Sequence, residues 1–194
     1  MTDQYQVEKV LQGDRDAFEL VIKNTEGLVA QILFKMINNT EDRKDIAQDI
    51  YFKVYKNLAS FKFQSKLSTW IARIAYNTCL NFLEMKKPGL IHTISIEDNS
   101  HIESLEKIIR TSTPAREAEN FIFQKELSKI LQCEIEKLSP VYKTLLTLFH
   151  KEELTYAEIS EITELPEGTV KNYLFRARKT LRENLLIQYK KEDL

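Results

Sequence analysis

Glycine and proline are scarce in this chain, and their scarcity limits the possible folds. The 194 residues include only four of each. Loop-rich proteins and β-proteins need many tight turns, which these two residue types favour. Helix-forming residues such as leucine, lysine and glutamate are abundant instead. We therefore predict an all-α protein, and the hydrophobic content of 43% is sufficient to bury helical cores.

Cysteines and long apolar runs are also lacking. The chain has only Cys79 and Cys133, without the Cys-x-x-Cys spacing of a zinc ribbon and too few for a disulfide scaffold. We expect both thiols to be free and buried. No apolar run reaches the roughly 18 residues needed to cross a bilayer, and the first residues show no secretory pattern. We therefore expect a cytoplasmic protein.

Signs of catalytic or cofactor sites are absent as well. The sequence has no glycine-rich phosphate loop, no Ser/His/Asp arrangement and no cluster of acids and histidines on one predicted face. His92 and His101 are isolated in a polar stretch, which is more typical of exposed spacers than of metal ligands. We predict a protein that is not an enzyme and uses no metal, cofactor or small-molecule substrate. A site assembled from residues distant in sequence stays open as the alternative.

Two short helices near the carboxyl end have the pattern of a helix-turn-helix DNA-binding unit. Thr155 and Glu158 form a capping box, so the first helix is predicted to begin at Thr155. Residues 163–166 interrupt the helical pattern, and Pro166 suits the first turn of the next helix. Gly168 in that turn would allow close approach of another backbone.

The second of these helices is expected to have a buried face and a basic face. Between residues 167 and 182, five basic residues stand against one acid, although the whole chain has a formal charge of −1. Such local positive charge is expected of phosphate binding, with an ordinary solvated helix face as the alternative. The positions predicted to face the core are Val170, Leu174, Ala177, Leu181 and Leu185. The outward positions include Lys171, Asn172, Phe175, Arg176, Lys179 and Arg182.

A first helical domain is predicted upstream of this unit. Helical periodicity fades after residue 87 and resumes at Thr113-Pro114, a plausible helix start. We therefore predict a first domain at 1–87, a flexible linker at 88–113 and a second domain at 114–188. The helices expected in the first domain cover about 4–12, 15–38, 42–59 and 67–86.

The helix predicted over 42–59 has an acidic face opposite its apolar face. Ile46, Ile50 and Val54 recur at helical spacing and are expected in the core. The opposite face carries Asp45, Gln48, Asp49 and Phe52. A phenylalanine exposed beside acids suggests a protein-docking surface. Equally favoured is a solvated face whose phenylalanine folds sideways into the bundle.

The segment 61–87 combines positive charge with aromatic rings, as single-strand binding requires. It has five basic residues against one acid. Stacking of a base on an aromatic ring contributes about 1–3 kcal/mol and needs no particular sequence. Trp70 shares its helix with Ile71 and is expected in the core. Phe61 and Phe63 lie in a predicted loop that core packing does not require, so they are the better stacking candidates.

Two parts of the chain resemble conserved regions of bacterial RNA polymerase sigma subunits. Residues 43–49, Phe61, the run Ser68-Thr69-Trp70-Ile71-Ala72-Arg73-Ile74-Ala75 and Asn77 resemble region two. The runs Leu138-Ser139-Pro140, Leu154-Thr155-Tyr156-Ala157-Glu158-Ile159 and 167–178 resemble region four of the extracytoplasmic-function group. The resemblance covers nearly the whole chain except the linker, and the two motifs occur in the family's order.

The resemblance implies a bacterial initiation factor that binds core RNA polymerase and promoter DNA, both duplex and melted. It also implies an anti-sigma protein as a partner, one able to hold the factor at a membrane. The residues implied in polymerase binding are Asp45, Gln48, Asp49 and Phe52. Those implied at the melted minus-ten element are Phe61, Lys62, Phe63, Lys66, Ser68, Trp70, Arg73 and Asn77. Those implied at the minus-thirty-five element are Glu167, Thr169, Lys171, Asn172, Phe175, Arg176, Arg178 and Lys179.

Three positions depart from the family pattern. Asp49 stands where glutamate is usual, Glu164 occupies a turn position often filled by glycine, and Glu167 brings an acid to the start of the recognition helix. None removes a required group. A stand-alone helix-turn-helix regulator is the alternative function, but it leaves the first domain unexplained.

Overall fold

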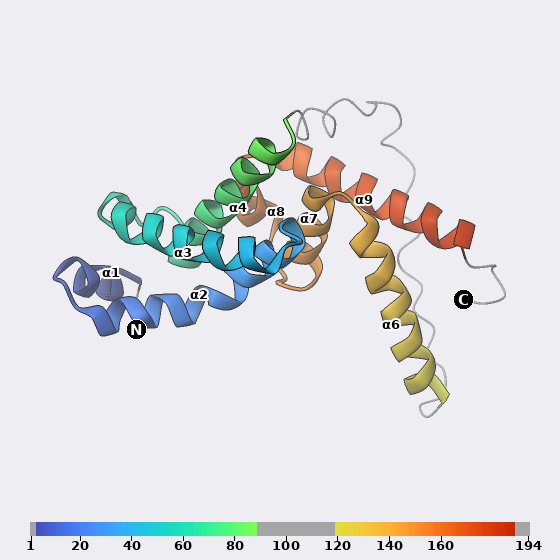
Figure 1. Cartoon of the computed structure of the whole chain (residues 1–194), viewed down its shortest axis with the longest axis horizontal. Coiled ribbons are helices and arrows are strands. Elements are labelled where there is room, and N and C mark those ends of the chain that lie inside the picture. Colours follow the sequence, from blue (N-terminus) through green and yellow to red (C-terminus); the bar gives the residue numbers. More distant parts are fainter. Residues whose placement is uncertain (1–2, 89–118, 189–194) are drawn as a thin grey trace.

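The computed structural model describes residues 3–88 and 119–188 of the chain (Figure 1). Within these ranges every regular element is a helix, so the predicted all-α class is confirmed. The predicted linker falls almost wholly outside the described residues, together with His92, His101 and residues 114–118. In the described part of the chain, no helix is both long enough and apolar enough to span a membrane.

The helices of the first half follow the predicted pattern closely. They are α1 (Asp3–Leu11), α2 (Arg15–Met36), α3 (Thr40–Asn57), the 3-10 turn η1 (Leu58–Ser60) and α4 (Leu67–Lys86). Helix α2 ends two residues earlier than predicted. Asn39 caps the next helix instead, since its side-chain oxygen accepts hydrogen bonds from the amides of Glu41 at 2.8 Å and Asp42 at 3.0 Å.

The second half contains the predicted helix-turn-helix. Its helices are α6 (Glu119–Lys137), α7 (Pro140–His150), α8 (Tyr156–Thr163) and α9 (Glu167–Gln188). The capping box at the start of α8 is confirmed in both directions. The Thr155 hydroxyl accepts from the Glu158 amide at 3.2 Å, and the Glu158 carboxylate accepts from the Thr155 amide at 3.0 Å.

The turn between α8 and α9 shows why glycine is usual in the family at the position of Glu164. Glu164 has φ +57°, in the left-handed region that glycine adopts without strain. An L-residue there costs about 1–2 kcal/mol, which is why glycine is usual at such a position. Gly168, by contrast, has no neighbour within 4 Å of where a Cβ would stand. The expectation that Gly168 permits close backbone packing is therefore wrong.

Helix α9 buries a shorter stripe than its periodicity predicts. Val170, Leu174 and Ala177 are fully buried, as expected. Leu181 and Leu185 are only half-buried, so the prediction that they lie in the core is wrong. The helix extends beyond α7 and α8 (Figure 1). A periodic apolar stripe marks a face, but partner helices decide how much of that face is covered.

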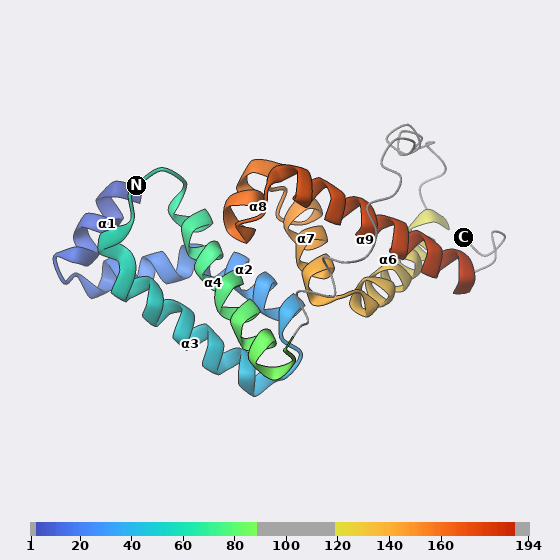
Figure 2. The ribbon, with the colours of Figure 1, turned by 90° about the horizontal axis from the view of Figure 1, so that it is seen from above.

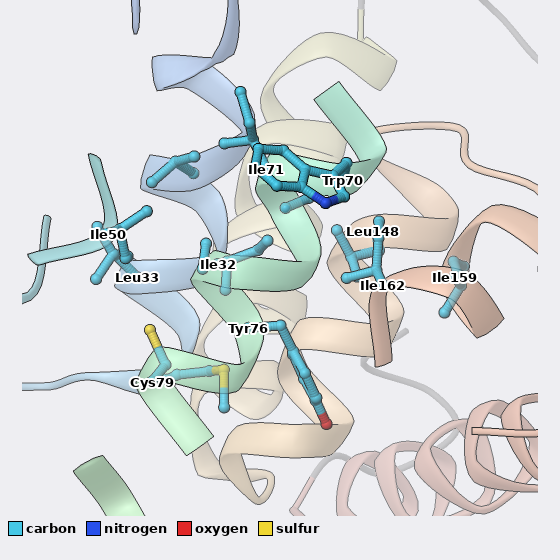
Figure 3. Packing of buried hydrophobic residues seen from close by; sticks show 14 of the residues in the cluster. Ile32, Leu33, Ile50, Trp70, Ile71, Tyr76, Cys79, Leu148, Ile159 and Ile162 are labelled. Carbon is cyan, nitrogen blue, oxygen red and sulfur yellow. The ribbon is translucent and has the colours of Figure 1, made fainter. Parts of the chain in front are cut away.

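The two halves of the chain pack directly against each other. Helix α4 lies against α8, and α2 lies against α7 (Figure 2). Figure 3 shows Trp70 of α4 beside Leu148 of α7 and Ile162 of α8, and all three are buried. The buried side chains of both halves therefore form one continuous apolar cluster.

The two cysteines have different environments. Cys79 lies on α4 within the core and is 0% exposed, as predicted. Cys133 on α6 is exposed, so the expectation that both are buried is wrong for this residue. Among the described helices, α6 has its main contact with α9, and Cys133 lies on a face that this contact leaves open.

Candidate nucleic-acid interface

The acidic face of α3 is exposed over its whole length. The exposed residues on this face are Asp45, Gln48, Asp49 and Phe52. Phe52 is 58% exposed, so the alternative in which its ring folds into the bundle is wrong. Lys53 pairs with Asp49 at 2.7 Å, and the Lys56 ammonium lies 5.1 Å from the centre of the Phe52 ring. A large apolar ring among charges is the arrangement expected of a docking surface.

Other exposed aromatic residues near this face were not predicted from the sequence. Tyr55, one turn beyond Phe52 on α3, is 54% exposed. Phe34 near the end of α2 is 57% exposed, and the Arg43 guanidinium lies 4.4 Å from the centre of its ring. Periodicity alone does not identify them, because apolar residues at helical spacing are usually buried.

The loop before α4 places its two phenylalanines differently. Phe61 is only 6% exposed, with its ring centre 5.3 Å from that of Trp70 and 4.7 Å from that of Phe63. We expected Phe61 to lie outside the core. This expectation is wrong, because the Phe61 ring packs on the buried ring of Trp70. Phe63 is 47% exposed and has φ +56°. A bulky residue rarely adopts this backbone conformation, and such strain is concentrated at functional sites.

A cavity of about 410 Å³ opens between this loop, α4 and α8. Its wall is mostly polar, with Phe61 and Trp70 contributing the aromatic part. The lining residues are Ser60, Phe61, Lys62, Gln64, Ser65, Thr69, Trp70, Arg73 and Glu161. Seven of them, from Phe61 to Arg73, belong to the segment 61–87 that we predicted to hold a melted strand, Ser60 directly precedes it, and Glu161 comes from the helix-turn-helix. The cavity is thus completed by the second domain.

Two further residues of the predicted single-strand surface contact α8 or the turn that follows it. The Lys66 ammonium pairs with Glu158 at 2.7 Å, and the Asn77 amide donates to Glu164 at 3.0 Å. Ser68 is half-buried in the first turn of α4, and Lys62 is exposed beside the cavity. The structure therefore places Lys66, Arg73 and Asn77 beside α8 or the turn that follows it.

The charges at this contact stabilise each other. The hydrogen bond from Lys66, followed by that from the Thr155 backbone amide, lowers the pKa of Glu158 to about 2. The same pair raises the pKa of Lys66 above its ordinary value. Both groups are therefore ionised at neutral pH.

The outer face of α9 is basic, as predicted. Lys171 and Lys179 are exposed, and the Lys171 ammonium lies 5.2 Å from the centre of the Tyr156 ring. Glu167 is exposed at the start of the helix, where an acid is favoured by the helix dipole. Five of the residues predicted to contact duplex DNA are half-buried, namely Thr169, Asn172, Phe175, Arg176 and Arg178.

Arg178 lies against α7 instead of on the open face. Its guanidinium is 5.2 Å from the centre of the Phe149 ring, and its Nε donates to His150 Nε2 at 3.3 Å. Burial, together with the charge of Arg178, lowers the pKa of His150, which keeps the ring neutral and able to accept this hydrogen bond. Helical periodicity did not include Arg178 among the outward residues, and only the resemblance placed it at the minus-thirty-five element. Its contact with Phe149 and His150 depends on the position of α7.

Comparisons with known proteins identify the family of the chain. The family model for Sigma-70 region 2 matches residues 21–88, and that for Sigma-70 region 4 matches residues 128–181. The chain is 31% identical over 179 residues to the ECF RNA polymerase sigma factor SigW of Bacillus subtilis, covering 92% of this chain and 94% of that protein. It is 34% identical over 187 residues to the ECF RNA polymerase sigma-E factor of Haemophilus influenzae, covering 95% and 96% respectively. The chain belongs to the ECF sigma factors.

Solved structures share the fold of this ECF sigma factor. CnrH in complex with the cytosolic domain of CnrY aligns with a TM-score of 0.63 and 16% identity, over 96% of this chain and 99% of that one. The sigma factor RpoE in complex with the anti-sigma factor NepR, from Bartonella quintana, aligns with a TM-score of 0.54 and 22% identity, over 89% and 98%. At these identities the likeness concerns the fold.

Proposed function

We propose that this ECF sigma factor binds core RNA polymerase and directs it to promoters, where it recognises both promoter elements and aids strand opening. It acts in the cytoplasm, with the polymerase, and catalyses no reaction itself. The observation that carries the proposal is the presence, in one chain, of a basic helix-turn-helix and of an upstream helical domain with a separate exposed docking face. A stand-alone regulator would need only the first of these.

The polymerase-binding surface in this proposal is the outer face of α3. Asp45 and Gln48 supply hydrogen-bonding groups, and the exposed Phe52 ring supplies the apolar centre that stable interfaces need. Asp49 is already paired with Lys53 at 2.7 Å, so its contribution is partly neutralised within the helix. The face is open to solvent, so it needs no rearrangement before a partner docks.

The minus-ten surface in this proposal is the cavity beside the loop 61–66. Phe63 presents its exposed ring to unpaired bases, and Lys62 lies where it can contact the strand's phosphates. Trp70 and Phe61 support this surface from within the core. Lys66, Ser68, Arg73 and Asn77 extend it along α4, with polar groups suited to a sugar-phosphate backbone.

The minus-thirty-five surface in this proposal is the outer face of α9. Asn172 and Arg176 have the amide and guanidinium groups that recognise base edges in the major groove, and Lys171 and Lys179 are placed for phosphates. Glu167 can accept a hydrogen bond from a cytosine amine. Thr169 and Phe175 flank these groups. Arg178 contributes by holding α9 to α7.

An anti-sigma factor is a further proposed partner. Two structures of the same fold were determined as complexes, CnrH with the cytosolic domain of CnrY and the sigma factor RpoE with the anti-sigma factor NepR. On the basis of this shared fold, we propose that an anti-sigma protein binds this chain and keeps it from acting with polymerase until an inducing signal arrives.

Run-off transcription on genomic fragments with purified core polymerase tests the function directly. We expect specific transcripts only when the chain is added. The double variant Asp45→Ala with Gln48→Ala should weaken binding to core polymerase, since loss of interface hot spots costs ~2 kcal/mol or more. The control, Glu19→Ala with Asn24→Ala, changes another exposed acid and amide on α2 and should bind normally. Specific duplex binding at physiological salt without any dependence on polymerase would favour the stand-alone regulator.

A further inference from the structure

A second cavity, of about 700 Å³, opens where α2 meets α6, α7 and α9. Helix α7 contacts both α2 and α9, and α6 contacts α9, so the walls come from both halves of the chain. Small-molecule sites usually have volumes of about 300–1,000 Å³ and often lie between the helices of bundles. The lining residues are Gln31, Lys35, Leu131, Gln132, Ile135, Leu146, Thr147, Phe149, His150, Lys151, Arg178 and Leu181.

The wall of this cavity is mostly aliphatic. Leucine and isoleucine side chains of α6, α7 and α9 supply it, together with the ring of Phe149. Leu131 is 39% exposed and Leu181 is half-buried. Leu181 belongs to the periodic apolar stripe of α9, yet it lines this cavity and is not covered by a neighbouring helix. An open apolar surface of this kind, rimmed by polar groups, is typical of a ligand-binding groove.

The polar groups of the rim are basic. No carboxylate is among the lining residues in the described part of the chain. Lys151 is exposed, and the Arg178 guanidinium lies 5.2 Å from the centre of the Phe149 ring. Neither cation forms an ion pair within residues 3–88 and 119–188. Positive charge without a partner, beside an apolar wall, favours a ligand with an apolar body and an anionic end.

Lys35 adds positive charge from α2. Its ammonium pairs with Glu136 of α6, and the Lys143 ammonium lies 3.3 Å from the same carboxylate. Partial burial raises the pKa of Glu136, but the hydrogen bonds and charges of Lys35 and Lys143 outweigh this effect and lower the pKa. The carboxylate is therefore ionised at neutral pH. Because two ammonium groups share one carboxylate, this cluster retains a net positive charge beside the cavity.

We propose that the cavity binds a free fatty acid, with the acyl chain against the aliphatic wall and the carboxylate near Lys151 and Arg178. A carboxylate accepts the charge-assisted hydrogen bonds that ammonium and guanidinium groups donate. A cavity between four helices suits a single acyl chain, whereas the flat surface of a membrane does not fit into it. The lining residues come from four helices, so no local sequence motif marks this site.

Calorimetric titration of the full-length protein with laurate, kept below its micelle-forming concentration, tests this inference. We expect saturable binding of one laurate per chain and a thermal midpoint that rises with laurate concentration, since the ligand binds the folded state. Hexanoate, with a shorter chain, should bind more weakly by about tenfold or more, because each buried methylene contributes about fourfold in affinity. Dodecyltrimethylammonium, with the same chain length and a cationic end, should bind as weakly.

Two substitutions locate the ligand in the cavity. Leu131→Glu puts a carboxylate on the aliphatic wall and should weaken laurate binding by about tenfold or more. Its control is Leu186→Glu, at an exposed leucine of α9 that does not line the cavity. Lys151→Gln removes an exposed cation of the rim and should weaken binding about threefold. Lys23→Gln, at an exposed lysine of α2 outside the cavity, should bind laurate like wild type.

The possible outcomes separate this ligand from other occupants. Absence of laurate binding by folded wild type overturns the proposal, as does an equal loss of affinity in both leucine variants. Lys151→Gln and its control decide the location if Leu131→Glu does not fold. Binding to anionic phospholipid vesicles without binding of free laurate would overturn the proposal and identify a membrane surface. A dimer that Leu131→Glu disrupts, again without laurate binding, would assign the wall to a second copy of the chain.

This site is independent of the proposed transcription function. It shares no residue with the docking face of α3 or with the cavity beside the loop 61–66. Run-off transcription therefore tests the proposed function, and laurate binding tests the cavity. Failure of one leaves the other standing.

Discussion

Single residues decide which groups of the candidate site are available to a ligand. Phe61 and Phe63 belong to the same loop, yet Phe61 is 6% exposed and Phe63 is 47% exposed. Contact with Trp70 makes Phe61 part of the core. Phe63 lies at the surface and has a left-handed backbone conformation. The same residue type therefore has a structural role at one position and a proposed binding role two positions later.

The two phenylalanines should respond differently to truncation. Phe61→Ala leaves a cavity beside Trp70 and should destabilise the protein by about 3–5 kcal/mol, measured by denaturant unfolding. Phe63→Ala should destabilise the protein less than Phe61→Ala, because Phe63 is already 47% exposed to water. It should nevertheless reduce permanganate reactivity of promoter thymines, which reports strand opening, while closed-complex binding persists. Normal opening by a folded Phe63→Ala variant would move strand capture to other groups of the loop, such as Gln64 and Ser65.

The two thiols should also differ in reactivity. Burial raises the pKa of the Cys79 thiol to about 12, so the reactive thiolate is almost absent at pH 8. Cys133 is exposed. A thiol-specific chromogenic reagent should therefore titrate one cysteine quickly and the second only after denaturation. Cys133→Ser should remove the fast phase, and a fast phase that persists in this variant would contradict the burial of Cys79.

At the scale of elements, α9 has a buried face that packs in the core and an outer face that is proposed to bind DNA. Its inner face, with Val170, Leu174 and Ala177, packs in the core, and its outer face carries the cations proposed for DNA. Neighbouring basic residues therefore have different surroundings. Arg178 packs against α7, whereas Lys179 is exposed.

Alanine substitutions at these neighbours should separate stability from DNA binding. Arg178→Ala loses a cation–π contact and a hydrogen bond to His150, and should lower stability by about 1 kcal/mol. Lys179→Ala should leave the thermal midpoint unchanged. It should weaken binding to all duplex sequences alike and reduce the slope of log affinity against log salt by about one. A stability loss at Lys179 equal to that at Arg178 would show that this division of roles is wrong.

At the scale of the whole molecule, the contact between the domains should depend on pH. A carboxyl whose pKa is lowered by a contact stabilises that contact only while it is ionised. For Glu158, with a pKa of about 2 against an ordinary 4.5, this stabilisation is complete above pH 4.5 and is lost as the pH falls through about 2. The lowered pKa of Glu136 acts in the same direction.

Comparison of wild type with Glu158→Gln measures this dependence. The difference in their thermal midpoints should be largest at pH 5 and above and should shrink as the pH falls toward 2. The control Glu19→Gln, at an exposed position on α2, should show no such trend. A constant difference between wild type and Glu158→Gln over this range would mean that the carboxylate of Glu158 does not hold the domains together.

Local signals in the sequence determined the helices and much of the candidate surface. The capping box at Thr155 and the apolar spacing of α3 involve residues within one or two turns of each other, so they can be recognised without a structure. The exposure of Asp45 and Gln48 follows from the same periodicity. The domain bounds stay a prediction.

Only the tertiary structure decided which residues of that surface are free. The burial of Phe61, the exposure of Cys133 and the docking of Arg178 on α7 each depend on which helix lies opposite. The contact of α8 with α4 is the clearest case, because Lys66 and Glu158 are 92 residues apart in the chain. Local periodicity identifies the face of a helix, but long-range packing selects its partner, and in this protein that partner covers the proposed single-strand surface.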